Sequence, residues 1–255
     1  MASRPDRVTR VILILGLLGL AGCDTGVGTQ PVSAGAGPPA DFAGIWVPDG
    51  PRAEAWPSPL PLTGAGREFT EKFDPAQHDP TGYCLPFGTP RNMLQTQYPL
   101  EIAQTDQLLL MIIQPNLANP EVRRIALDGR EHPGETEPSW FGTSTARWEG
   151  ATLVIETTGL RPDALVSGSG IGHSGELRVV ERLSLATDDD QGKVLLNQIE
   201  LHDPVTFQEP VTVRRYFNWA PSAQMQEGNC VELKWIDRLW RERLQEHAGT
   251  SKEGT

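Results

Sequence analysis

Apolar side chains recur at every second position in several segments of this chain, and this alternation constrains the fold more than any other feature. Leu177, Val179, Leu183 and Leu185 share one face of an expected strand. A period of two indicates strands with one buried face, because successive side chains of a strand point to opposite sides of the sheet. The same alternation returns in "KVLLNQIEL" and "VTVRRYFNW". We therefore expect an all-β domain.

Other segments predict further strands. "DFAGIWVP" and "EVRRIALDG" each indicate a single strand, and "QYPLEIAQTDQLLLMIIQ" predicts a hairpin around Thr105–Gln107. "TSTARWEGATLVIETTG" predicts a hairpin with Glu149-Gly150 as its two-residue turn, which pairs Trp148 with Ala151. The resulting face contains Ala146, Trp148, Leu153 and Ile155. Six to nine antiparallel strands predict a closed or nearly closed barrel.

The first 22 residues have the features of an export signal. Arg4, Arg7 and Arg10 precede the apolar run "VILILGLLGL", which is about half of the roughly 20 residues that a membrane-spanning helix needs. "LAGC" resembles a bacterial lipobox and predicts cleavage before Cys23 and acylation of that cysteine. An ordinary secretory signal with an incidental cysteine is the alternative. We expect a lipid-anchored, periplasm-facing protein of the bacterial envelope, and Asp24 favours the inner membrane.

Composition sets the expected boundaries of the mature chain. Residues 23–40 are rich in Gly and Pro and predict a flexible tether that begins with the lipidated cysteine. Residues 41–247 predict a single barrel domain. The domain starts with a Pro-rich, largely irregular segment containing a short helix near Arg67–Phe73, and it ends in a helix over "WIDRLWRERLQEH". Residues 248–255 predict a disordered tail.

The expected compartment decides how the remaining cysteines are interpreted. With Cys23 lipidated, Cys84 and Cys230 remain, and two cysteines in an oxidising compartment predict a disulfide. Two free thiols are the alternative. The net charge is −11, and no cluster of lysine or arginine stands out. This charge argues against a nucleic-acid partner and against adhesion to anionic headgroups, so the lipid is the expected membrane attachment.

Glu181 falls on the oily face of its strand, where an unpaired carboxylate would be costly. If the next hairpin pairs Leu185 with Lys193, Glu181 faces Asn197, and the last strand places Arg215 beside Asn197. Neighbouring strands lie about 4.8 Å apart, so we expect the three polar side chains to form a connected row. A satisfied buried ion pair is one interpretation. A polar patch in a ligand cavity is the other, with Glu181 as acid or base and Arg215 and Asn197 binding the ligand.

Two further residues are candidates for a site. His173 follows the flexible run "GSGIG" and is expected at one end of the barrel, either as a proton-transfer group or as a solvated loop side chain. Trp148 faces inward and either stacks on a ligand or belongs to the core. "GSGIGH" lacks the last glycine of a dinucleotide fingerprint, and the histidines show no metal-ligand spacing. We therefore expect no cofactor and no metal.

The segments "CLPFGTPR", "RRIALDGREHP", "PSWFGTSTARWEG" and "HSGELRVVERL" resemble a family of poorly characterised exported bacterial proteins. The resemblance covers most of the chain from Asp41 to Cys230 and implies a lipocalin-like barrel and an exported location. It implies no catalytic residue. The chain departs from the family pattern after His-Ser, where Gly175 replaces an acidic residue and Glu176 follows one position later.

The sequence supports hypotheses from different functional classes. The first is a lipoprotein whose barrel cavity binds a small apolar or amphipathic molecule. The alternative is a cofactor-independent enzyme of the isomerase, hydratase or cyclase type, in which Glu181 or His173 moves protons. A third possibility is an envelope scaffold whose barrel is filled with side chains.

Overall fold

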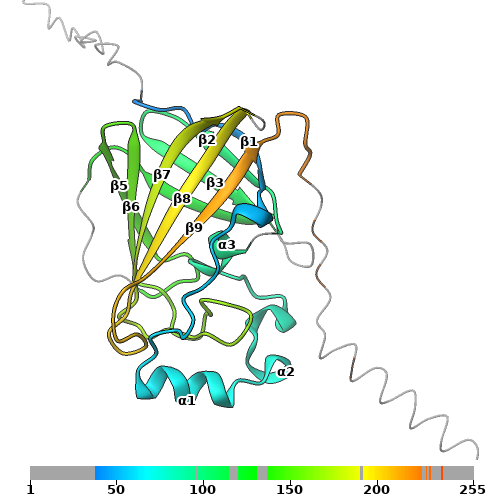
Figure 1. Cartoon of the computed structure of the whole chain (residues 1–255), viewed down its shortest axis with the longest axis vertical. Coiled ribbons are helices and arrows are strands. Elements are labelled where there is room, and N and C mark those ends of the chain that lie inside the picture. The colour runs from blue at the N-terminus through cyan, green and yellow to red at the C-terminus, as the bar shows by residue number, and fades with distance from the viewer. Residues whose placement is uncertain are drawn as a thin grey trace, which may run out of the picture. The chain divides into compact units, whose positions relative to one another are not determined.

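The strands of the computed structural model close into one barrel in chain order, from β1 to β9 and back to β1. The structure describes residues 38–95, 97–114, 120–130, 137–189, 192–225, 228, 230 and 237, which belong to one compact unit, Gly37–Thr255. The barrel wall is drawn from blue β1 to orange β9 in Figure 1. The prediction of a β-barrel is confirmed.

The strands are short in the first half of the barrel and long in the second. They are β1 Gly44–Pro48, β2 Leu100–Gln104, β3 Leu108–Ile113, β4 Glu121–Ala126, β5 Thr143–Glu149, β6 Thr152–Thr158, β7 Arg178–Asp188, β8 Gly192–His202 and β9 Val211–Trp219. The helices whose bounds fall within the described residues precede β2. They are η1 Gly50–Arg52, α1 Gly64–Lys72, α2 Pro75–His78, η2 Pro80–Tyr83 and α3 Arg91–Leu94. The segments expected to form strands therefore do so, and α1 corresponds to the helix expected near Arg67–Phe73. The expected terminal helix lies almost entirely outside the described residues.

One junction of the barrel differs from the expected antiparallel pattern. β4 and β5 run parallel and share a single paired position, Ala126 with Thr145. The other neighbouring pairs among the described strands are antiparallel, with registers of three to eleven paired positions. Because few backbone hydrogen bonds can form at such a short contact, the β4–β5 junction must be held largely by side chains.

The turn of the β5–β6 hairpin lies one residue later than predicted. Glu149 pairs with Thr152, so the turn residues are Gly150 and Ala151, and Trp148 pairs with Leu153. Gly150 has a φ of 63°. Two-residue hairpin turns require a positive φ at their first central position, which glycine adopts without steric cost. The glycine therefore sets the register. The residues predicted to share one face of this hairpin nevertheless do so, because the partner of Trp148 moves by two residues, from Ala151 to Leu153.

The β7–β8 hairpin shows the same kind of displacement. Leu185 pairs with Leu195 and not with Lys193 as predicted, and the hairpin closes with Asp188 opposite Gly192. Gly192 has a φ of 71°. A glycine in this left-handed conformation ends the loop at no steric cost, so the turn again determines the register.

The displacement changes the neighbours of the buried carboxylate. Glu181 faces Ile199, while Asn197 faces Leu183, so the predicted pairing of Glu181 with Asn197 is wrong. The predicted pairing of Asn197 with Arg215 on β9 is confirmed.

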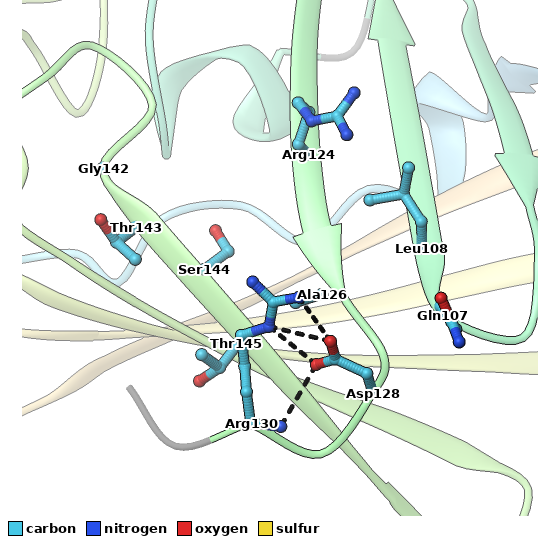
Figure 2. A pocket seen from close by; sticks show the side chains of 10 residues that line it. All are labelled: Gln107, Leu108, Arg124, Ala126, Asp128, Arg130, Gly142, Thr143, Ser144 and Thr145. Atoms are coloured by element: carbon cyan, nitrogen blue, oxygen red, sulfur yellow. Dashed lines mark hydrogen bonds and ion pairs between the residues drawn. The ribbon is translucent and has the colours of Figure 1, made fainter. Parts of the chain in front are cut away.

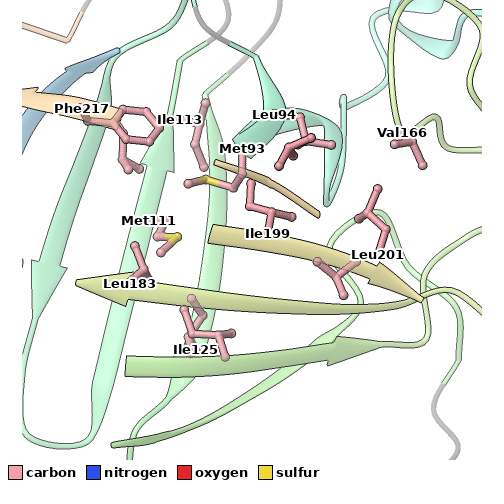
Figure 3. Close-up of a cluster of buried hydrophobic side chains, with 14 of the residues drawn as sticks. Met93, Leu94, Met111, Ile113, Ile125, Val166, Leu183, Ile199, Leu201 and Phe217 are labelled. Atoms are coloured by element: carbon pink, nitrogen blue, oxygen red, sulfur yellow. The ribbon is translucent and has the colours of Figure 1, made fainter. Parts of the chain in front are cut away.

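The barrel interior is packed with apolar side chains from all around the wall. Short helix α3 is fully buried and inserts Met93 and Leu94 among them. Figure 3 shows these two side chains beside Ile199 of the wall. Buried Phe42 and Trp46 belong to the same cluster. The centre of the barrel is thus a hydrophobic core.

Helices α1 and α2 lie at one end of the barrel, beside the loops that precede β7 and follow β8 (Figure 1). Thr63 caps the N-terminus of α1 by accepting a hydrogen bond from the Gly66 amide at 3.1 Å. Cys84, at the end of η2, forms a disulfide with Cys230, as predicted, with their Cα atoms 5.7 Å apart. Among the described residues, no helix has the length and apolar character needed to span a membrane.

Candidate functional site

Glu181 forms a buried ion pair with Arg123, a residue of β4. The two side chains are each 1 % exposed, and the guanidinium Nη1 lies directly against the carboxylate Oε2. Asn197 also contacts this carboxylate, because its Nδ2 donates a hydrogen bond to Oε1 at 2.9 Å. The carboxylate on the oily face is therefore compensated by a charged partner, but that partner is not Arg215.

The Arg123 side chain links β4 to the strands that follow the weak junction. Its Nη2 donates to Thr157 on β6 at 2.7 Å and to Ser144 on β5 at 3.2 Å. The two hydroxyl oxygens lie 2.8 Å apart. One guanidinium thus connects β4 with β5, β6 and β7, and these contacts compensate for the few backbone hydrogen bonds between β4 and β5. We call Arg123, Ser144, Thr157, Glu181 and Asn197 the arginine cluster.

The other predicted ligand-binding residues contact protein groups. Arg215 donates from Nε to the Leu94 carbonyl at 2.8 Å and from Nη1 to the Glu54 carbonyl at 2.9 Å, so it holds α3 in the barrel. Trp148 stacks on Phe42 with ring centroids 5.8 Å apart and packs against the core. These contacts fit a structural role for both side chains.

A pocket of about 500 Å³ opens at the β4–β5 junction, directly outside the arginine cluster. We call it the seam pocket. Figure 2 shows its walls on β4, β5 and the loop after β4. It is lined by Gln107, Leu108, Arg124, Ala126, Asp128, Arg130, Gly142, Thr143, Ser144 and Thr145. Ser144 belongs to both sites, and only 8 % of it is exposed. The pocket forms here because two strands that share one paired position leave the wall open.

Two arginines, Arg124 and Arg130, line the seam pocket. Arg130 binds Asp128 through Nε at 2.8 Å, and this hydrogen bond lowers the pKa of Asp128 to about 2. The carboxylate is therefore ionised near neutral pH and neutralises Arg130. Within the described part of the chain, Arg124 has no hydrogen-bonding or ionic partner. Leu108 and Ala126 provide the apolar part of the lining.

His173 lies beside α1, does not belong to the lining of the seam pocket, and is only 7 % exposed. The alternative of a solvated loop side chain is therefore wrong. Its Nδ1 lies 2.8 Å from the Ser174 carbonyl oxygen. Burial lowers the pKa of the imidazole, while the Ser174 carbonyl and the carboxylates of Asp203 and Asp163 partly oppose this shift. The structure does not bring His173 and Glu181 into one site.

The shift predicts a pH dependence of stability. Because the pKa of His173 is lower in the folded protein than in the unfolded chain, the unfolded chain binds the proton more readily. This contribution to stability is complete above the unfolded pKa of about 6.5 and decreases as the pH falls toward the folded pKa. We expect the loss of thermal stability between pH 7 and pH 5 to be smaller in His173→Phe than in the wild-type protein. Parallel loss in both proteins would contradict this.

The sequence did not lead us to predict Arg123 as a buried residue, although the alternation along its strand indicates this. Ile125 is apolar and expected to face inward, so a period of two places Arg123 and Glu121 on the same buried face. Glu121 is 3 % exposed and accepts hydrogen bonds from the Phe87 amide and from Nδ2 of Asn92. Burial raises the pKa of this carboxyl. Two adjacent arginines concealed the pattern, because arginines are expected to be exposed.

No family model matches this sequence, and neither does any curated protein. The resemblance to exported bacterial proteins therefore stays a prediction. Within the described residues, no group of three or more His, Cys, Asp or Glu side chains has a geometry that could hold a metal ion.

Proposed function

We propose that this chain is a lipid-anchored exported protein with a lipocalin-like barrel, and that it binds a small amphipathic anion in the seam pocket. The observation that carries the proposal is Arg124, which has no ionic partner among the described residues, beside apolar Leu108 and Ala126 in a pocket of about 500 Å³. Ligand pockets typically measure about 300–1,000 Å³ and combine apolar walls with a few polar groups that orient the ligand.

The place of binding follows from how the barrel is filled. Core side chains and α3 occupy the centre of the barrel. We therefore place the ligand in the pocket in the barrel wall at the β4–β5 junction. Arg124 would bind a carboxylate or similar anionic group, since a guanidinium recognises such groups by charge-assisted hydrogen bonds. Leu108 and Ala126 would contact the apolar part of the ligand. The arginine cluster behind Ser144 would keep the pocket in shape.

The proposed location rests on the sequence features of the first 23 residues. A lipid on Cys23 would hold the barrel near a membrane surface, where amphipathic molecules concentrate. A disulfide between Cys84 and Cys230 fits an oxidising compartment. Intact-mass measurement of full-length protein extracted from bacterial membranes would show whether Cys23 carries acyl chains.

Binding is tested with octanoate as the anionic probe and octanol as its uncharged counterpart. The mature chain, residues 24–255, is exported behind a secretory signal without a lipobox and titrated by calorimetry. We expect Arg124→Gln to weaken octanoate binding about fivefold, which corresponds to about 1 kcal/mol for a partly exposed ion pair, and to leave octanol binding unchanged. Ala126→Trp, which fills the pocket from the outer face, is expected to abolish binding of both probes.

Arg147→Gln is the matched control, because Arg147 is an exposed arginine of β5 that pairs with Glu149 outside the pocket. It should leave octanoate binding unchanged. Absence of octanoate binding to the wild-type chain, or equal weakening by Arg147→Gln and Arg124→Gln, would overturn the proposal.

A further inference from the structure

Strand β4 has a full pairing partner on only one of its two sides. Six of its positions pair with β3, whereas one position, Ala126, pairs with β5 at Thr145. In Figure 2 the two strands meet near Ala126 and Thr145 and diverge toward Arg124 and Gly142. The part of β4 that precedes Ala126 therefore has an edge that faces the seam pocket. We call this the open edge of β4.

The main-chain groups of two residues point toward this open edge. In an antiparallel pair, residues that exchange main-chain hydrogen bonds with the partner strand alternate with residues whose N–H and C=O point away from it. The Leu127 amide donates to the Gln107 carbonyl, on the β3 side, at 2.9 Å. Counting back along β4, Val122 and Arg124 direct their N–H and C=O away from β3. Within the described residues, no hydrogen bond joins either of these main-chain positions to the β5 side.

The segment that enters β5 explains why the edge of β4 stays open. Gly142, directly before β5, has a φ of 60°, so the backbone is not extended at this residue. A Cβ atom on Gly142 would lie 2.4 Å from the carbonyl oxygen of Thr158 at the end of β6. The chain therefore enters β5 packed against β6, and β5 does not supply a paired strand to Arg124.

The side chains of the same two residues add an apolar and a cationic group to the open edge. Val122 is 46 % exposed although it is a large apolar residue, and Arg124 is exposed and lines the seam pocket. An exposed strand edge binds extended peptides by adding a strand, in which main-chain hydrogen bonds give affinity and alternate side chains give specificity. A guanidinium beside such an edge fits a carboxylate.

We propose that the ligand of the seam pocket is the carboxyl-terminal end of an extended peptide, which pairs with the main chain of Val122 and Arg124 and places its terminal carboxylate against the Arg124 guanidinium. This inference rests on the proposed function, because it assigns a chemical class to the amphipathic anion. An acyl anion uses only the guanidinium and the apolar lining. A peptide with apolar side chains uses the main-chain groups of the open edge as well.

The test uses the peptide acetyl-Ala-Val-Leu with a free carboxylate, titrated by calorimetry into the exported mature chain. Two derivatives carry an N-methyl group, one on the valine amide and one on the leucine amide. Because adjacent amides of a strand point to opposite sides, we expect one derivative to bind about tenfold more weakly and the other to bind within about twofold of the parent. The carboxamide form should bind about fivefold more weakly, and Arg124→Gln should remove this difference.

Val122→Pro tests the same pairing from the side of the protein. Proline lacks the N–H that points toward the open edge, and it is tolerated where that N–H is not part of a ladder. We expect peptide binding to weaken about tenfold and octanoate binding to remain unchanged. Val122→Thr is the matched control, because it keeps the N–H and the branched shape. Thermal unfolding checks that both variants fold, and the N-methyl pair tests the pairing without any substitution in the protein.

Each outcome assigns the open edge differently. Binding of octanoate without binding of the peptide, or equal affinity of the two N-methyl derivatives, would overturn this inference and leave the proposed function intact. Binding of neither octanoate nor the peptide would overturn both. A concentration-dependent dimer that is lost in Val122→Pro and is not displaced by the peptide would assign the edge to a second copy of the chain, and so would overturn the inference.

Discussion

Replacing Glu181 by glutamine is expected to destabilise the protein by about 3–5 kcal/mol, because the substitution leaves the Arg123 guanidinium buried and charged without its counter-ion. Glutamine preserves the shape of the side chain, so the loss reports on charge and not on volume. The free energy of unfolding, measured by urea titration, checks this. Glu156→Gln is the control, because its ion pair with Arg178 is exposed at 38 % and 39 % and should contribute less than about 1 kcal/mol.

The double variant Arg123→Met, Glu181→Met distinguishes a pair interaction from simple loss of packing. Removing both charges avoids an unpaired buried ion, so the double variant should be more stable than Arg123→Met or Glu181→Met alone. Additive losses in the two single variants would contradict the role of the pair. A loss of less than 1 kcal/mol in Glu181→Gln would do the same.

Removal of the disulfide is expected to cost about 5 kcal/mol. Cys84 and Cys230 are 146 residues apart, and chain-entropy arguments give about that stabilisation for a loop of this length. The double variant Cys84→Ser, Cys230→Ser should therefore unfold at a much lower urea concentration than the oxidised wild-type protein. Wild-type protein kept reduced during the titration should unfold like the variant. Equal stability of oxidised protein and variant would show that the bond does not constrain the unfolded chain.

The strands could be predicted because their signal is local. Alternation of apolar residues marks β7, β8 and β9, and the last of these has the predicted bounds, Val211–Trp219. The hairpin registers could not be predicted in the same way. Pairing polar with polar residues favoured Glu181 opposite Asn197, whereas left-handed Gly192 places Ile199 there. The conformation of one turn residue outweighed side-chain preferences along the strands, because it fixes the backbone path from which both strands start.

The burial of His173 also could not be predicted from the sequence pattern around it. The glycine-rich run before it predicted an exposed loop. The structure buries the imidazole because α1, from a distant segment of the chain, packs over the loop, with the ring of Phe69 lying against Gly172. Exposure depends on which elements meet in space, and the sequence of the loop carries no information about its covering helix.

The sequence by itself determined that Glu181 is buried, since a period of two places it on the same face as Leu183 whatever the partner strands are. Only the tertiary structure decided which residue compensates its charge. Closure of the barrel brings Arg123 of β4 to Glu181 of β7, across a junction that has one paired backbone position. The period of a strand is a property of neighbouring residues, whereas the partner of a buried charge depends on how all nine strands close around the core.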